Sequence, residues 1–290
     1  LFGFSENNYQ QTQTNFEISK NCQGSLLLTS KVNHKSYQVG QFSTPNLEYL
    51  IETVNQLSKN KDILQGDIVY ERRVIGDIFN HHVRSPGALF QAASQFNCLE
   101  FVNPHQIPEN GIYRYQNDHT QGPACALATV PGTIYRNYFV LVNSHQGQNK
   151  QYQLNNLDSV QHYLKSKFGD SFITVTNGYS ESTPNQLKRL NKLLETDKSL
   201  SIEIKKRLKF GFHQHTQVVF KSRWKQVSSK KTSLVSQIYC SALAINYSKV
   251  KDKKLWEPLS RIILDASYEA TLLAGIINFS ETGNPNIFLT

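Results

Sequence analysis

The sequence predicts an α/β fold in which helices cover both faces of a mixed β-sheet. Stretches rich in β-branched and aromatic residues alternate along the chain with stretches whose apolar residues recur at helical spacing. Helix-start signals, such as Thr183 followed by Pro184, separate the two kinds of stretch. The sequence contains no internal repeat, and 290 residues are enough to bury one large core. In folds of this class, ligands bind at the carboxyl ends of the strands.

Several segments are predicted to be helical. In the first, Thr44 is the expected N-cap and Pro45 the first helical residue, and the apolar residues that follow recur at helical spacing. Thr183 opens a capping box, so the helix that starts there should continue to about Leu194. Two further helices are expected over residues 157–168 and 257–277.

Strand character is found in many short segments, and the first two are expected to form a hairpin. The segments are 25–29, 36–42, 67–74, 135–142, 171–176, 208–212, 218–220, 235–242 and 287–290. Residues 1–24 are rich in Asn, Gln, Ser and Thr with little apolar periodicity, which predicts a loosely tethered polar lead-in. Residues 25–290 are expected to form a single domain.

The composition bears on whether the protein binds nucleic acid, contains disulfides or a metal, or crosses a membrane. The formal net charge is +9, but the lysines are spread over the second half of the chain without interleaved aromatic residues. A solvated basic face is therefore favoured, and nucleic-acid binding through residues 205–231 and 249–254 is a weaker alternative. The four cysteines are far apart, so we expect no disulfide framework, no metal site and no cofactor. Without a long apolar run or a secretory signal, no membrane segment is predicted, and we expect an intracellular protein, cytoplasmic or nuclear.

The stretch from residue 76 to residue 133 has the profile of a site for a phosphorylated ligand. It begins with Gly76 and Asp77 in an acidic turn, and small residues then lead into the amide-rich segment 95–97. Asp118 precedes a helix start at residues 120–125 that contains Gly and Pro. Small residues let a backbone approach a ligand closely, and N–H groups at a helix start favour phosphate.

Five segments carry a resemblance to one protein family. In chain order they read GALFQAASQFNCLEF, NGIYRYQNDHTQGPACALA, GTIYRNYFV, VSQIYCSALAINYS and SYEATLLA. Their order and spacing resemble the arginine-specific macrodomain ADP-ribosyl hydrolases, over roughly residues 25 to 290. The resemblance implies a macrodomain-like three-layer α/β/α sandwich with a mixed central sheet. It also implies that the partner is ADP-ribose or an ADP-ribosylated protein.

The resemblance implies roles for two groups of residues that precede the middle of the chain. Asp77 would accept from the adenine amine, with Ile78 beside it in the site. An Asp that forms a turn with its own backbone is an equally good interpretation. Gln95, Phe96 and Asn97 would lie beside the distal ribose, whose hydroxyls amides can read as donors and acceptors. A polar surface loop is the alternative.

The diphosphate would lie at the helix start after Asp118. By the resemblance, Thr120, Gln121, Gly122 and Ala124 bring backbone N–H groups towards it, although an ordinary helix start is also consistent with these residues. Three later residues are expected near the same cleft, and for each of them core packing is at least as good an interpretation. They are Tyr239, Ser241 and Tyr247.

Hydrolysis of ADP-ribosyl-arginine breaks an N-glycosidic bond, for which carboxylates are the expected catalytic groups. The resemblance implies two aspartates eight positions apart, of which Asp118 is present and the first is replaced by Asn110. Neighbouring Glu109 is the candidate substitute, although a shift of one residue usually points a side chain elsewhere. Glu100 lies in an apolar segment and needs a partner or a raised pKa, and a structural role is favoured for it.

Two alternatives to an enzyme of this kind remain. A non-catalytic module, either a reader of ADP-ribosylated partners or a structural subunit of a larger assembly, is favoured by Asn110. It is also favoured by the C-terminus: the family's glycine-rich phosphate loop is expected directly after residues 286–290, so the domain is predicted to be truncated there. The other alternative takes Cys125 as a nucleophile with His119 nearby. It is the weakest one, because Cys125 sits among alanines, as a packed and unreactive thiol does.

Overall fold

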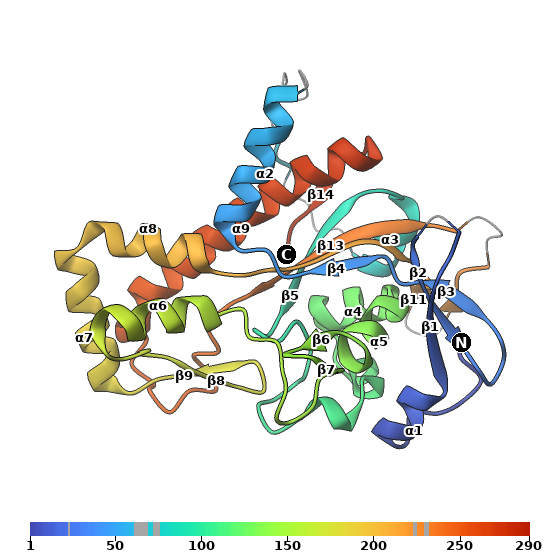
Figure 1. The fold of residues 1–290 in the computed structure, drawn as a ribbon, viewed down its shortest axis with the longest axis horizontal. Helices are drawn as coiled ribbons and strands as arrows, with labels where there is room; N and C mark the ends of the chain where they lie inside the picture. The colour runs from blue at the N-terminus through green and yellow to red at the C-terminus, as the bar shows by residue number, and fades with distance from the viewer. Residues whose placement is uncertain (23, 61–68, 72–75, 223–224, 229–231) are drawn as a thin grey trace.

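The computed structural model describes the chain except for residues 23, 61–68, 72–75, 223–224 and 229–231. Its central element is a five-stranded sheet with the spatial order β14 (Ile287–Phe288), β5 (Leu89–Ser94), β13 (Leu234–Ser241), β10 (Gly211–Gln217) and β4 (Gln41–Ser43). Strand β5 runs parallel to β14 and β13, whereas β10 runs antiparallel to β13 and β4 (Figure 1). The predicted α/β fold with a mixed sheet is confirmed.

Helices cover both faces of this sheet. They are α2 (Leu47–Asn60), α4 (Gln121–Ala128), α5 (Val130–Tyr138) and α9 (Lys253–Thr282). Alternate residues of a strand point to opposite faces. Leu89 and Cys240 pack in the apolar core that contains α2 and α9, whereas Ala92 and Tyr239 pack with Cys125 of α4. The helices on the two faces therefore belong to separate layers, with the sheet between them.

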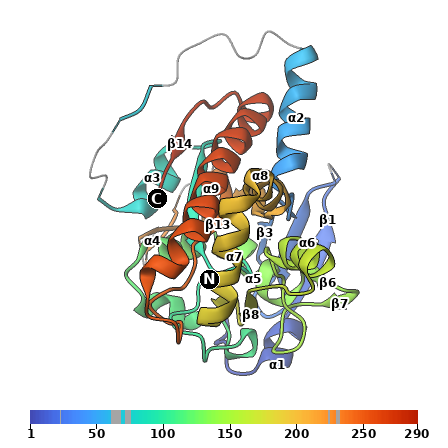
Figure 2. The ribbon, with the colours of Figure 1, turned by 90° about the vertical axis from the view of Figure 1, so that its left-hand side faces the viewer.

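The remaining helices of the described residues are α1 (Tyr9–Thr14), α3 (Ile78–Arg84), α6 (Asp158–Phe168), α7 (Pro184–Thr196) and α8 (Lys198–Arg207). Helices α6, α7 and α8 gather at one end of the molecule, which faces the viewer in Figure 2. Helices α6, α7 and α9 confirm three of the predicted helices. The fourth, α2, begins two residues later than its predicted first residue, because Asn46 Oδ1, not Thr44, accepts from the first turn, at 2.9 Å from Tyr49 N.

Short strands form small antiparallel sheets beside the main one. They are β1 (Phe16–Lys20), β2 (Leu26–Ser30) and β3 (Ser36–Gln38) in one sheet, β6 (Leu141–Val142) with β7 (His145–Gln146), β8 (Thr174–Thr176) with β9 (Tyr179–Glu181), and β11 (Phe220–Ser222) with β12 (Lys225–Gln226). The predicted strand 36–42 is divided between β3 and β4, which belong to different sheets. Gly40 lies at the crossing with φ +85°, and an added Cβ would come 2.0 Å from Gln214 O.

One strand prediction was wrong. Residues 130–138 form helix α5, and within the predicted strand 135–142 only Leu141 and Val142 pair as a strand. Helix α5 is buried on nearly every side, and its buried residues include the polar Thr133, Arg136 and Asn137. The aromatic and β-branched residues of this segment resemble a strand in sequence. The predicted strand 67–74 lies largely outside the described residues.

Residues 1–24 are not the loosely tethered lead-in that their composition predicts. Strand β1 pairs with β2 along its whole length, and Phe16 of β1 is buried. The rings of Phe2 and Phe4 pack on Phe16 with centroid distances of 4.8 and 5.1 Å. These few aromatic residues lack a regular spacing, so periodicity could not reveal that they reach the core.

Helix α9 is the one helix of the described residues that is long and apolar enough to cross a membrane. In the structure one side of it packs on the sheet, where Trp256, Ile263 and Ala270 are buried. Core packing therefore accounts for its apolar composition.

Candidate functional site

The candidate site lies where the parallel strands β5 and β13 end. Ser94 and Ser241 are paired in register as the last residues of these two strands. The first turn of α4 lies directly against this edge, because a Cβ added to Gly122 would come 2.3 Å from Ala93 O. Carboxyl ends of parallel strands beside a helix start are where open α/β sheets bind ligands.

Asp118 is fixed at the entrance to α4. It follows the 3₁₀ helix η2 (Tyr113–Asn117), and its Oδ1 accepts from Thr120 N at 2.8 Å and from Thr120 Oγ1 at 2.6 Å. Thr120 is the N-cap residue of α4, so its hydroxyl holds Asp118 instead of capping the helix. The arrangement places a half-buried carboxylate beside the helix N-terminus.

Glu100 lies at the same helix start, from the interior side. Only 3% of the residue is exposed, and its Oε2 lies 2.4 Å from the position of a Cβ added to Gly122. Among the residues that the structure describes, none donates a hydrogen bond to the buried Glu100 Oε1. Burial raises the pKa of Glu100 well above its usual value, Arg136 opposes the shift, and Asp118 adds to it. The sequence favoured a structural role for Glu100, but the structure brings it to the candidate site.

Arg136 of α5 provides the buried positive charge near Glu100. Its Nε donates to Cys98 O at 3.1 Å, and Nη2 donates to Thr133 Oγ1 at 3.1 Å. The guanidinium carbon lies 4.0 Å from the centroid of the Tyr239 ring, a cation–π contact. Tyr239 is completely buried, so in this structure its side chain packs in the core and is not exposed at the site.

The amides predicted beside the ribose are turned inward. Gln95 Oε1 accepts from Phe101 N at 2.9 Å, and Asn97 Oδ1 accepts from Leu99 N at 3.1 Å. Phe96 is 1% exposed and packs in the main core. These three side chains are engaged within the protein, so the predicted side-chain contacts with a ribose are not available in this structure.

Gln121 also bonds within the protein. Its side-chain Oε1 accepts from Ala93 N at 3.1 Å, and its Nε2 donates to Gln91 O at 2.7 Å. Strand β14 pairs with β5 only at residues 89 and 90. The Gln121 amide therefore continues the hydrogen bonding of the β5 edge beyond the end of β14, and it fixes α4 against the sheet.

Helix α3 begins at Asp77 and Ile78, so these residues do not form an open turn. Asp77 is the N-cap of α3, and its Oδ1 accepts from Phe79 N at 3.0 Å. Asp77 therefore bonds its own backbone, which is the alternative to the predicted contact with adenine. Ile78 packs beside Ala92 of β5 and Ala124 of α4, so it adjoins the candidate site from the α3 side.

Two tyrosines and a serine complete the surroundings. Tyr179 of β9 donates to Phe101 O at 2.6 Å, and Tyr247 donates to Val102 O at 3.2 Å, with their rings 5.2 Å apart. Tyr247 is 55% exposed and is therefore accessible to a ligand. Ser241 is buried at the end of β13, and within the described part of the chain its Oγ has no hydrogen-bond partner.

Glu109 and Asn110 face a different cavity. They line a hollow of about 700 Å³ that the N-terminal residues 4–9 close from the other side, and Asp118 is not part of its lining. Glu109 Oε1 accepts from Lys150 N at 2.9 Å, and Asn110 Oδ1 accepts from Ile107 N at 3.0 Å. The structure therefore does not bring positions 110 and 118 into one cavity. The Glu109 carboxylate bonds to Lys150 N and does not take the predicted place beside Asp118.

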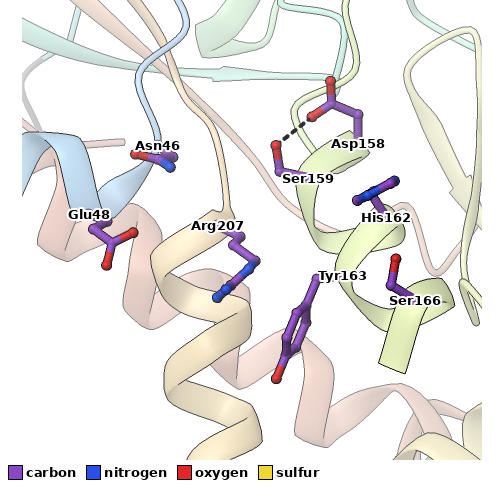
Figure 3. A pocket seen from close by; sticks show the side chains of 8 residues that line it. All are labelled: Asn46, Glu48, Asp158, Ser159, His162, Tyr163, Ser166 and Arg207. Carbon is purple, nitrogen blue, oxygen red and sulfur yellow. Dashed lines mark hydrogen bonds between the residues drawn. The ribbon is translucent and has the colours of Figure 1, made fainter. Parts of the chain in front are cut away.

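A second hollow, of about 840 Å³, lies between α2, α6 and α8 (Figure 3). Arg207 covers the ring of Tyr163 at 4.2 Å and forms an ion pair with Glu203. Asp158 forms an ion pair with Lys209 at 2.8 Å. Because these charges are paired within the protein, the groove is a weaker candidate than the end of the parallel strands.

The alternative with a cysteine nucleophile has no support in the geometry. Cys125 is completely buried, and burial raises the pKa of its thiol, which disfavours the reactive thiolate. Among the described residues, no group of three or more His, Cys, Asp or Glu side chains is arranged to hold a metal ion.

Comparison of the chain with protein-family models, with curated proteins and with solved structures finds no match in any of the three. The assignment of a function therefore rests on the residues and their geometry.

Proposed function

We propose that this protein binds ADP-ribose at the carboxyl ends of β5 and β13 and hydrolyses the N-glycosidic bond of ADP-ribosyl-arginine on proteins. The observation that carries the proposal is the position of Asp118 beside the first turn of α4, where Thr120 holds its carboxylate with two hydrogen bonds. The resemblance of the five sequence segments to macrodomain hydrolases favours the same ligand.

The chemistry of the ligand agrees with these groups. The first turn of a helix has N–H groups without intrahelical partners and a positive end of the helix dipole, which together favour a diphosphate. Exposed Tyr247 is available to stack on a base or ribose. Breaking the N-glycosidic bond develops positive charge on the ribose, and the Asp118 carboxylate stabilises that charge and orients the attacking water.

Calorimetric titration with ADP-ribose tests the binding step, and release of ADP-ribose from arginine-modified protein tests the reaction. We expect Asp118→Asn to lose about 100-fold or more of the hydrolysis rate, the range for loss of an acid–base group. Asp158→Asn is the matched control, because Asp158 is a carboxylate of the groove between α2, α6 and α8. Absence of binding heat with the natural protein contradicts the proposal.

Binding without hydrolysis, in a reader or a structural subunit, is the second candidate. It is favoured by Asn110, which replaces an aspartate of the resembled family and lines the cavity that Asp118 does not line. Binding of ADP-ribose together with no turnover, in both the natural protein and Asn110→Asp, identifies a reader. Turnover gained by Asn110→Asp identifies a weakened enzyme instead.

A further inference from the structure

The Glu100 carboxylate and the diphosphate of the proposed ligand would both carry negative charge at the start of α4. Glu100 reaches the first turn from the interior, with Oε2 2.4 Å from the Cβ position of Gly122. A diphosphate bound to the N–H groups of this turn approaches from solvent. An ionised Glu100 and a diphosphate repel each other across one helix turn, and the low dielectric constant around Glu100 makes the repulsion strong.

We infer that Glu100 is a positioning residue that couples anion binding at the first turn of α4 to the uptake of one proton. The inference rests on the proposed function, because it names how the same site accepts a diphosphate. At pH values above the pKa of Glu100, binding joins the ligand, one proton from solvent and the protein with ionised Glu100, and the product is the complex with a neutral Glu100 carboxyl. The buried Oε1, which has no partner among the described residues, is an atom that can take this proton without breaking a hydrogen bond.

Among the described residues, the charged groups that act on Glu100 are Asp118 and Arg136. Asp118 approaches from the residue stretch before α4 and raises the pKa of Glu100, and Arg136 of α5 lowers it. The other titratable neighbours are neutral over the physiological range, because burial raises the pKa of each. They are Tyr115, Tyr179, Tyr239, Cys98 and Cys125.

The direction of the pH effect follows from the raised pKa of Glu100. Below that pKa the carboxyl is already neutral, and the affinity for an anionic ligand is at its maximum. Above it, each bound ligand requires the uptake of one proton, so the affinity falls by about tenfold for each pH unit.

The test is a titration of the protein with ADP-ribose between about pH 6 and about pH 9, with Glu100→Gln and with Asp158→Asn as a control. We expect the natural protein and Asp158→Asn to lose affinity as the pH rises. The neutral, isosteric glutamine should remove this slope.

A second measurement needs no variant. Calorimetry of the natural protein in the pH range where its affinity falls, in buffers with different heats of protonation, should report uptake of about one proton for each ligand bound. Binding with no net proton uptake, or an equal slope in Glu100→Gln, overturns the inference while it leaves the proposed function intact. Absence of binding at any pH overturns both.

Discussion

Gly122 is the residue on which the geometry of the candidate site depends most directly. It allows α4 to lie against the end of β5, because a Cβ at this position would meet Ala93 O at 2.3 Å and Glu100 Oε2 at 2.4 Å. The backbone oxygen belongs to the sheet and cannot move away cheaply. Alanine here would therefore push α4 away from the strand and displace Glu100 at the same time.

We expect Gly122→Ala to destabilise the protein by about 2 kcal/mol, since overpacking outweighs the helix propensity of roughly 1 kcal/mol that alanine gains over glycine. Gly275 of α9 is the matched helical control, because its nearest contact is Ile287 Cδ1, the end of a flexible side chain, at 2.2 Å. Urea unfolding of both variants measures the difference. An equal or smaller loss in Gly122→Ala would show that α4 does not depend on this close approach.

Several residue roles could not be predicted from the sequence because they depend on where a side chain turns. Gln95 and Asn97 are amides in a loop, for which ligand contact was predicted and surface exposure was the alternative, and only the structure shows their bonds to Phe101 N and Leu99 N. Glu100 was predicted to need a partner or a raised pKa, and the structure shows it buried, which raises its pKa. Its place beside Asp118 depends on contacts between distant elements.

At the scale of single elements, local signals predicted α7 and the other helices with a long run of helical spacing, whereas α1, α3 and α8 have side-chain caps and were not predicted. The capping box at Thr183 predicted α7, and Thr183 Oγ1 accepts from Gln186 N at 3.3 Å as expected. No side chain caps helix α5, and nearly all of its residues are buried, so it has no exposed polar side. Its aromatic and β-branched residues favour a strand, but packing against neighbouring elements determines a helix. Such packing cannot be predicted from a local sequence pattern.

The Thr183 cap should therefore have a measurable effect. We expect Thr183→Ala to lower the free energy of unfolding by about 1 kcal/mol, because a helix N–H loses its acceptor. Lys188→Ala, an exposed position in the middle of the same helix, should change it by less than about 0.5 kcal/mol. Thermal unfolding followed by circular dichroism compares the two, and equal shifts would mean that the cap contributes nothing beyond helix propensity.

At the scale of the whole molecule, the N-terminal segment is fixed to the middle of the chain by one carboxylate. Glu6 Oε1 accepts from Ile112 N at 3.0 Å and from the Tyr138 hydroxyl, and Oε2 accepts from Tyr113 N at 2.6 Å. Burial raises the pKa of Glu6, and these hydrogen bonds lower it. Tyr9 adds a bond to Asn137 O at 3.0 Å. A sequence rule has no means to pair Glu6 with residues more than a hundred positions away.

Loss of this carboxylate should destabilise the whole protein and not only its first residues. In Glu6→Ala, two backbone N–H groups and the Tyr138 hydroxyl lose their acceptor, and each unsatisfied group costs about 1–3 kcal/mol. Water that enters the adjoining cavity of about 700 Å³ satisfies some of them, so we expect a total loss of about 3 kcal/mol. Glu17→Ala, an exposed change on β1, is the control and should alter stability by less than about 0.5 kcal/mol. Urea unfolding should show one transition that moves to lower urea in Glu6→Ala. A separate early transition with the main one unmoved would mean that the N-terminal segment folds independently of α5.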